Sequence, residues 1–115
     1  MNAAVPGALV VGFIAARFFW FRVRSGRARA MVAAGASLID VRTPQEFEVD
    51  HLPEARNLPL DRLIAQPHGV GSKDRPVVVY CRSGTRSAIA ARALKRAGYE
   101  TVVNLGPMFA WGARA

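Results

Sequence analysis

The strongest constraint on the fold of this chain is the run "VVVYC" at residues 77–81, in which no residue carries a charge or an amide. A strand without alternating polar residues is typical of the centre of a parallel sheet, where helices cover both faces. Strand-like and helix-like segments alternate on both sides of this run. The sequence therefore predicts an α/β fold, a small parallel sheet with helices on both faces.

The segments around this run divide into short strands and short helices. Strands are expected at 37–41, 55–58 and 101–105, and helices at 28–35, 43–51, 61–66 and 87–97, with a loop over 67–76. Thr43 suits the N-cap of the second helix, Pro44 suits its first position, and Glu46 completes a capping box. Gly98 follows the last of these helices and is expected to end it.

The N-terminal segment over residues 3–21 is apolar apart from Arg17. A helix of this length extends about 28 Å, close to the hydrocarbon thickness of a bilayer. No basic residue precedes the segment, whereas a secretory signal peptide carries positive charge before its apolar run. We expect one N-terminal transmembrane helix, although "ARA" at 28–30 resembles a cleavage site and leaves a cleaved signal as the alternative.

Basic residues follow the apolar segment at once. They are Arg22, Arg24, Arg27 and Arg29. The positive-inside rule places such a flank in the cytoplasm. We therefore expect an anchor and basic flank over 1–26, and a domain over 27–115 on the cytoplasmic side of the cell membrane.

Charge and composition exclude several classes of site. The formal net charge is +8, and five of the basic residues lie within the first 30 residues, where they suit anionic headgroups. No basic stripe is interleaved with aromatic residues, so we expect no nucleic-acid partner. The single cysteine rules out an intrachain disulfide and suits a reducing compartment. Together with only two histidines, it argues against a protein metal site, and no cofactor is expected.

The single cysteine, Cys81, ends the apolar strand, where parallel sheets bind their ligands. The following "RSGTRS" holds Gly84 in a tight turn that leads into a helix, so several backbone N–H groups point at one spot. Arg82 and Arg86 add positive charge. Such surroundings lower a thiol pKa from about 8.5 to between about 3.5 and 7.5. We expect a nucleophilic thiolate in an anion-binding loop, rather than a cysteine that merely fills the core.

Four segments together resemble the rhodanese domain, the sulfurtransferase family, over residues 27 to about 112. They are "DVRTPQEF", "HLPEARNLP", "CRSGTRS" and "NLG" followed by a tryptophan. The resemblance implies that Cys81 takes a sulfane sulfur from a donor such as thiosulfate or a persulfide, carries it as a persulfide, and passes it to a thiophilic acceptor. It also implies a loop that cradles the persulfide and the donor, formed by Arg82, Ser83, Gly84, Thr85, Arg86 and Ser87.

The same resemblance assigns supporting positions outside the loop. Asp40 and Arg42 belong to "DVR", with a structural role, and we expect Arg42 to pair with Glu46. His51 and Asn57 lie in the second motif and are expected to support the scaffold rather than the chemistry.

The chain departs from the family pattern at two loops. It has Asp50 and Glu54 where the family often has glycine, and Gly106-Pro107 in place of a Gly-Gly pair. These loops are expected to differ in detail from those of the family.

Three functions remain open from the sequence. The first is a membrane-anchored sulfurtransferase whose persulfide passes to a small thiol, to cyanide or to another protein, because the chain has no second cysteine. The second is a phosphatase or arsenate reductase, although those enzymes close the loop with an arginine six positions after the cysteine, where this chain has Ser87. The third is a non-catalytic binding module, which loss of the cysteine would indicate.

Overall fold

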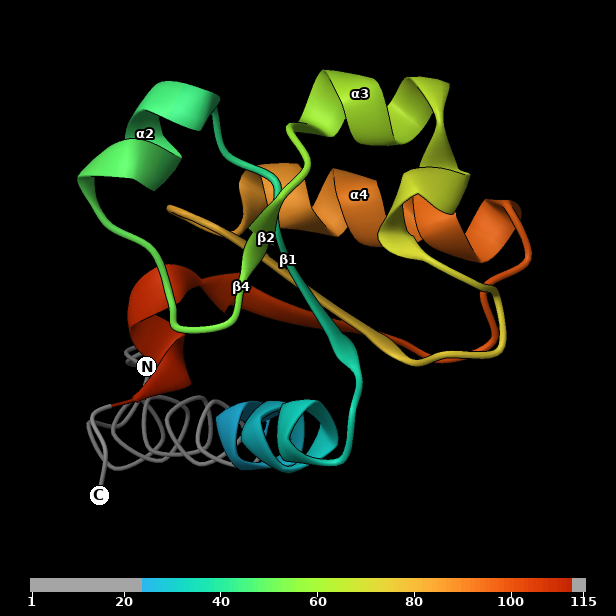
Figure 1. The fold of residues 1–115 in the computed structure, drawn as a ribbon, viewed down its shortest axis with the longest axis horizontal. Helices are drawn as coiled ribbons and strands as arrows, with labels where there is room; N and C mark the ends of the chain where they lie inside the picture. The colour runs from blue at the N-terminus through green and yellow to red at the C-terminus, as the bar shows by residue number, and fades with distance from the viewer. Residues whose placement is uncertain (1–23, 113–115) are drawn as a thin grey trace, which may run out of the picture.

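The computed structural model describes residues 24–112, which contain a four-stranded parallel sheet in the order β2-β1-β3-β4 (Figure 1). The strands are β1 (Ser37–Asp40), β2 (Arg56–Asn57), β3 (Val77–Cys81) and β4 (Val102–Pro107). All five residues of β3 are buried, and β3 lies between β1 and β4. The predicted α/β class and the central place of the "VVVYC" strand are confirmed.

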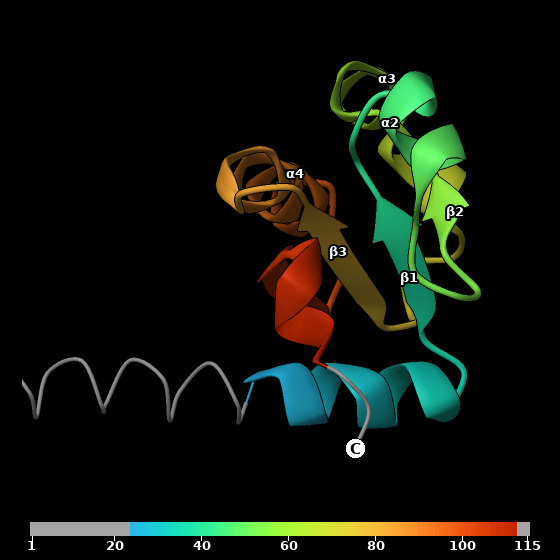
Figure 2. The ribbon, with the colours of Figure 1, turned by 90° about the vertical axis from the view of Figure 1, so that its left-hand side faces the viewer.

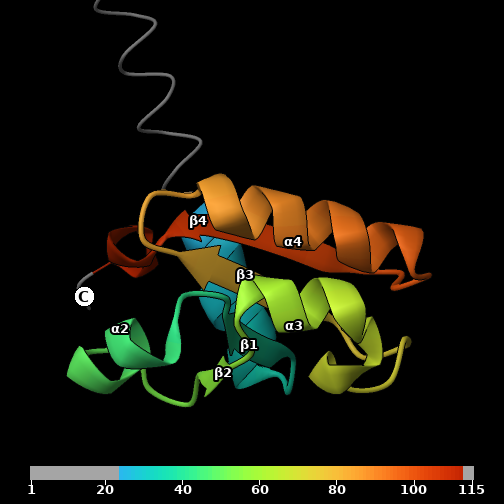
Figure 3. The same cartoon turned by 90° about the horizontal axis from the view of Figure 1, so that it is seen from above.

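Helical segments cover both faces of the sheet (Figures 2 and 3). They are the helical residues 24–33, α2 (Pro44–Val49), α3 (Leu60–Ala65), η1 (Pro67–Val70), α4 (Thr85–Arg96) and η2 (Met108–Trp111). Alternate residues of β3 face opposite sides. Val77 and Val79 join the core under α3 and α4, whereas Val78 and Tyr80 join the core shared with residues 24–33 and η2.

The helix α2 begins as its sequence predicts. Thr43 Oγ1 accepts from Glu46 N at 3.1 Å, and Glu46 Oε1 accepts from Thr43 N at 2.9 Å, which completes the capping box. The helix ends at Val49, two residues earlier than predicted, because Asp50 has an extended backbone with φ −168°.

Two boundaries in the second half of the chain also differ from the prediction. The loop over 67–76 contains η1, a 3₁₀ turn with Pro67 at its start. The helix predicted from residue 87 begins at Thr85, because Gly84 adopts the left-handed conformation and turns the chain directly into α4. Most of the sequence-based boundaries therefore err by two residues or fewer, while η1 was missed.

The N-terminal predictions are described only in part. The predicted transmembrane segment over 3–21 lies outside the described residues, as does Arg22, whereas Arg24, Arg27 and Arg29 of its basic flank are described. Within residues 24–112, no helix is long and apolar enough to cross a membrane. The helix over 24–33 runs through residue 26, where the predicted anchor ends, and its Ala28 is fully buried against the sheet.

Candidate active site

The Cys81 side chain is held at the carboxyl end of β3, beneath the loop that leads into α4. It is fully buried. Its Sγ accepts from Gly84 N at 2.9 Å and from Ser87 N at 3.4 Å. The thiol lies 3.5 Å from Ser87 Oγ, which itself donates to Gly84 O at 3.1 Å. The loop thus directs two backbone N–H groups at the sulfur, and the Ser87 hydroxyl oxygen accepts from the thiol.

The loop takes this path because of Gly84, whose φ is +101°. L-residues with a side chain rarely adopt this left-handed conformation, whereas glycine adopts it without steric cost. A β-carbon at Gly84 would lie 3.6 Å from Pro107 Cδ, which is ordinary van der Waals contact. The backbone conformation, rather than lack of space, therefore makes glycine necessary at this position.

The hydrogen bonds outweigh burial in setting the acidity of the thiol. Burial raises the pKa of Cys81, because a buried anion loses its hydration. Hydrogen bonds from the Ser87 side chain and from the backbone N–H groups of Ser87, Gly84 and Ser83 favour the thiolate. Together they hold the pKa of Cys81 below its ordinary value, as the sequence predicted for a cysteine in such a loop.

The two arginines of the loop lie in different surroundings. Arg82 is exposed and lines a pocket. Arg86 donates to Glu46 through both terminal nitrogens, Nη1 to Oε1 at 2.7 Å and Nη2 to Oε2 at 3.1 Å. The charge of Arg86 is therefore compensated by a carboxylate of the protein, while Arg82 faces the solvent-filled side of the loop.

Arg42 pairs with Asp40 and not with Glu46, so the expected Arg42–Glu46 pair is wrong. Arg42 Nη2 donates to Asp40 Oδ2 at 2.7 Å, and Arg42 Nε lies 3.1 Å from both Asp40 oxygens. Arg42 Nη2 also donates to Asp50 O at 2.6 Å. Asp40 and Arg42 are both buried and lie two residues apart at the end of β1, and Glu46 pairs with Arg86 instead.

Asn57 and His51 contact backbone rather than the cysteine loop. Asn57 Nδ2 donates to Asp40 O at 3.0 Å and to Arg42 O at 2.9 Å, and so fixes the turn after β1. His51 Nδ1 lies 2.8 Å from Phe47 O, and the two rings stack with centroids 3.7 Å apart. Both positions suit the supporting role that the sequence predicts for them.

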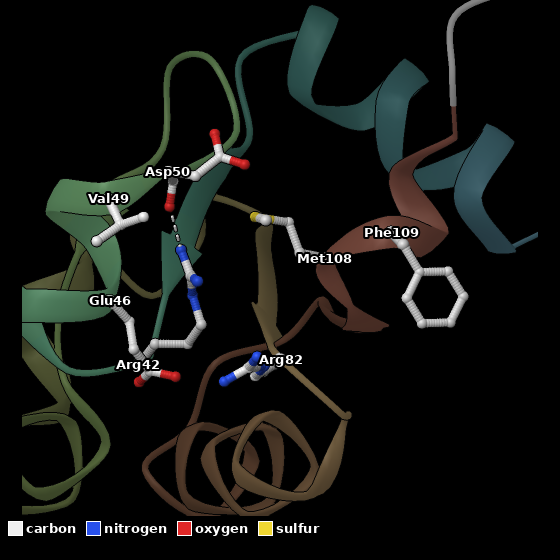
Figure 4. A pocket seen from close by; sticks show the side chains of 7 residues that line it. All are labelled: Arg42, Glu46, Val49, Asp50, Arg82, Met108 and Phe109. Carbon is white, nitrogen blue, oxygen red and sulfur yellow. Dashed lines mark hydrogen bonds between the residues drawn. The ribbon is translucent and has the colours of Figure 1, made fainter.

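A pocket of about 370 Å³ lies beside the cysteine loop, between α2 and η2 (Figure 4). Its lining residues are Arg42, Glu46, Val49, Asp50, Arg82, Met108 and Phe109. The side chains of Arg82 and Met108 point into the space between the two elements, and the Phe109 ring points away from it (Figure 4). Val49 and Phe109 are 87% and 77% exposed, so two exposed apolar side chains border a pocket that is otherwise lined mainly by charged residues.

The pocket is the part of the site that the sequence did not reveal. Val49, Met108 and Phe109 belong to no motif, and only the fold brings α2 and η2 to the same edge of the sheet. The Glu46–Arg86 pair was also missed, since 40 residues separate its partners. A signal for this pair was present in the sequence. Glu46 was already expected in a capping box, and its carboxylate can also accept from an arginine of the cysteine loop.

The site contains the parts needed for thiol chemistry on an anion. A sulfur of lowered pKa receives N–H donors at the start of a helix, and an exposed arginine borders the adjacent pocket. Among residues 24–112, no cluster of histidine, cysteine or acidic side chains is arranged to hold a metal ion. The fold and the site thus define an α/β domain that holds a cysteine thiol of lowered pKa beneath a loop of backbone N–H donors.

Comparison with known proteins gives the family. Residues 25–114 match the rhodanese-like domain, and the chain belongs to that family. The uncharacterized protein YqhL of Bacillus subtilis (strain 168) is 35% identical over 111 residues, which cover 93% of this chain and 87% of YqhL. A sulfurtransferase of Allochromatium vinosum is 43% identical over 75 residues, which cover 64% of this chain and 69% of that protein.

A solved structure shows the same fold. "Rhodanese with anions from E. coli" is 30% identical, with a TM-score of 0.63, and the match covers 70% of this chain and 95% of that chain. The parallel sheet and the cysteine loop described above are therefore those of a rhodanese-like domain, and named sulfurtransferases are among its relatives.

Proposed function

We propose that this chain is a sulfurtransferase in which Cys81 carries sulfur as a persulfide. The observation that carries the proposal is the contact of Gly84 N and Ser87 N with Cys81 Sγ, at 2.9 and 3.4 Å. These two N–H groups stabilise the Cys81 thiolate, which attacks the sulfur donor. The same N–H groups are suited to stabilise the terminal sulfur anion of a persulfide, because they form a fixed positive environment at the start of α4.

The proposed reaction has two steps and needs no external oxidant. The Cys81 thiolate attacks the sulfane sulfur of thiosulfate, the S–S bond of the donor breaks, and sulfite leaves with its electron pair. The acceptor nucleophile then attacks the outer sulfur of the persulfide. The Cys81–sulfur bond breaks, and its electron pair regenerates the Cys81 thiolate.

Arg82 is the residue that we assign to the anionic donor. It is exposed, it lines the pocket beside the loop, and it follows Cys81 directly in the chain. Arg86 is assigned to the support of the loop, since both of its terminal nitrogens bind Glu46. The rhodanese with anions from E. coli, a relative of the same fold, supports an anion site in this chain.

The acceptor is a small thiol, cyanide or a thiol of another protein. Cys81 is the only cysteine in the chain, so no resolving thiol exists within it. The thiol itself is fully buried, and the exposed Arg82 follows it directly in the chain, so we assign the approach of the donor and the acceptor to the pocket that Arg82 lines.

The phosphatase alternative is less well supported. Its loop needs an arginine that wraps a tetrahedral oxyanion, whereas Arg86 is bound to Glu46 and Ser87 is bound to the cysteine loop. An assay of the purified chain with thiosulfate, glutathione persulfide and an aryl phosphate separates the two functions. We expect transfer of sulfur from at least one sulfur donor and no release of phosphate. Phosphate release without sulfur transfer would overturn the proposal.

We also propose that residues 3–21 anchor the domain in the cell membrane, with the domain on the cytoplasmic side. The support is the apolar run and the arginines that follow it. The similarity to YqhL covers 93% of the chain and so extends into this segment. We expect the full chain to stay with membranes through a high-salt wash, because a spanning helix does not depend on screened charge.

The anchor is tested by a truncation and by protease. A chain that begins at residue 24, which keeps the whole described helix, should be soluble and retain activity. Protease added to intact spheroplasts should leave the domain of the full chain intact. Digestion before lysis would place the domain outside, and release by salt alone would make the segment a surface-bound helix.

A further inference from the structure

Glu46 joins the start of α2 to the start of α4. Its Oε1 accepts from Thr43 N at 2.9 Å and from Arg86 Nη1 at 2.7 Å, and its Oε2 accepts from Arg86 Nη2 at 3.1 Å. One carboxylate therefore belongs to the capping box of one helix and to an ion pair with the other. The capping box restricts the Glu46 side chain before Arg86 binds it.

Arg86 is placed so that its position affects the cysteine loop. It lies between Gly84 and Ser87, the residues whose N–H groups contact Cys81 Sγ. Gly84, Arg86 and Ser87 all belong to the start of α4. A displacement of the Arg86 backbone therefore changes the direction in which the N–H groups of Gly84 and Ser87 point.

The first turn of α4 carries a cation without a side-chain cap. Gly84, at the N-cap, has no side chain with which to cap, and the next residues include Arg86. A positive charge at a helix N-terminus opposes the helix dipole. Glu46 compensates the charge of Arg86, and it does so from another element of the fold.

We propose that Glu46 is a positioning residue for the sulfur-transfer chemistry proposed above: through Arg86 it keeps the N–H groups of Gly84 and Ser87 aimed at Cys81 Sγ. Glu46 does not touch the sulfur and takes no part in bond making. Its contribution is the geometry of the loop, and this leaves Arg82 as the arginine that faces the donor.

The ion pair is present throughout the neutral pH range. The hydrogen bonds from Arg86, and then those from Thr43, lower the pKa of Glu46 to about 2. Glu46 is therefore ionised wherever the thiol titrates, and a substitution at Glu46 can be studied without a change in its own protonation.

The test is the variant Glu46→Gln, which removes the charge and keeps the capping box, since glutamine also serves at that position. The measurement is the pKa of Cys81, from the ultraviolet absorbance of the thiolate against pH, with Cys81→Ser as the blank. We expect the pKa of Cys81 to rise by about half to one unit, which corresponds to the weakening of one hydrogen bond to the thiolate. The matched control is Glu48→Gln, an exposed glutamate two residues further along α2, which should leave the pKa of Cys81 unchanged.

Charge alone predicts the opposite sign. Removal of a negative charge near the thiol lowers its pKa if the loop does not move. A pKa of Cys81 that falls or stays the same in Glu46→Gln would therefore overturn the proposal.

A second variant separates an action through Arg86 from a direct one. In an Arg86→Gln background, Glu46→Gln should have little further effect, because its partner is already gone. An equal effect in both backgrounds would also overturn the proposal. The absorbance measurement uses no sulfur donor. A failure to transfer sulfur would therefore refute the proposed function only. The role of Glu46 would still be tested by the absorbance titration of Cys81.

Discussion

The backbone nitrogen of Gly84 lies 2.9 Å from Cys81 Sγ, in a loop whose path requires the left-handed φ of +101° at Gly84. The conformation that turns the chain into α4 thus also supplies the shortest hydrogen bond to the sulfur. The stability of the loop and the acidity of the thiol depend on the same backbone dihedral angle.

Gly84→Ala is expected to reduce both quantities. A β-carbon in the left-handed region costs about 1–2 kcal/mol, and relaxation of that strain moves the N–H away from the sulfur. We expect a lower free energy of unfolding in urea and a higher pKa of Cys81. Gly26→Ala is the control, because Gly26 lies in a helix and its β-carbon would meet no atom within 4 Å. That variant should gain about 0.5–1 kcal/mol. Equal behaviour of the two variants would contradict the account.

The pH dependence of stability follows from the lowered pKa of Cys81. A group that ionises more easily in the folded state than in the unfolded state adds stability as the pH rises between its two pKa values, and that stability is lost as the pH falls through the folded-state value. Wild-type protein should therefore gain thermal stability relative to Cys81→Ser as the pH rises from the folded-state pKa to about 8.5. A difference in Tm that is constant across this range would show that the thiol is not stabilised as an anion.

Arg82 and Arg86 should respond differently to the charge of the donor. Arg82→Ala is expected to raise the KM for thiosulfate several-fold and to change the KM for an uncharged persulfide little, since a charge-assisted contact is lost. Arg86→Ala should reduce turnover with both donors alike, because its side chain holds Glu46. Arg92→Ala, exposed on α4, is the control. A donor-specific loss in Arg86→Ala, with none in Arg82→Ala, would reverse the two assignments.

The departures from the family pattern at Glu54 and Asp50 differ in their backbone conformation. Glu54 has φ +69°, whereas Asp50 is extended. Glu54→Gly should therefore raise the free energy of unfolding by about 0.5–1 kcal/mol, because it removes the strain of a residue with a β-carbon in the left-handed conformation. Asp50→Gly should lower it by a similar amount, because the unfolded chain gains freedom and no strain is relieved. Urea denaturation of the two variants checks the signs, and a loss of stability in Glu54→Gly would contradict the expectation.

The sequence predicted the parts of this protein that depend on local pattern. The apolar run of β3, the capping box at Thr43 and the turn at Gly84 each follow from residues close together in the chain. The pairing of Arg86 with Glu46 did not follow, because Glu46 could pair with Arg42 or with Arg86 as far as local charges go, and only the fold brings Glu46 within reach of Arg86.

The residues that line the pocket could not be predicted from the sequence for a related reason. Val49 and Phe109 are apolar side chains that the fold leaves exposed, and a local pattern assigns such residues to the core. Likewise, the pairing of β3 with β4 shifts by one residue, since Val79 pairs with Asn104 and Tyr80 pairs with Gly106, which leaves Leu105 as the extra residue. Such irregularities depend on contacts between strands, which a single strand's sequence does not contain.

The central claim, that Cys81 carries the transferred sulfur, is tested most directly by the intact mass of the protein after incubation with thiosulfate. The account predicts a gain of roughly 32 Da, one sulfur atom, located on Cys81 and lost again when cyanide or a thiol is added. Cys81→Ser should fold, gain no mass and transfer no sulfur. Turnover at the wild-type rate by Cys81→Ser, or turnover by the wild-type protein through a state that never gains this mass, would contradict the account.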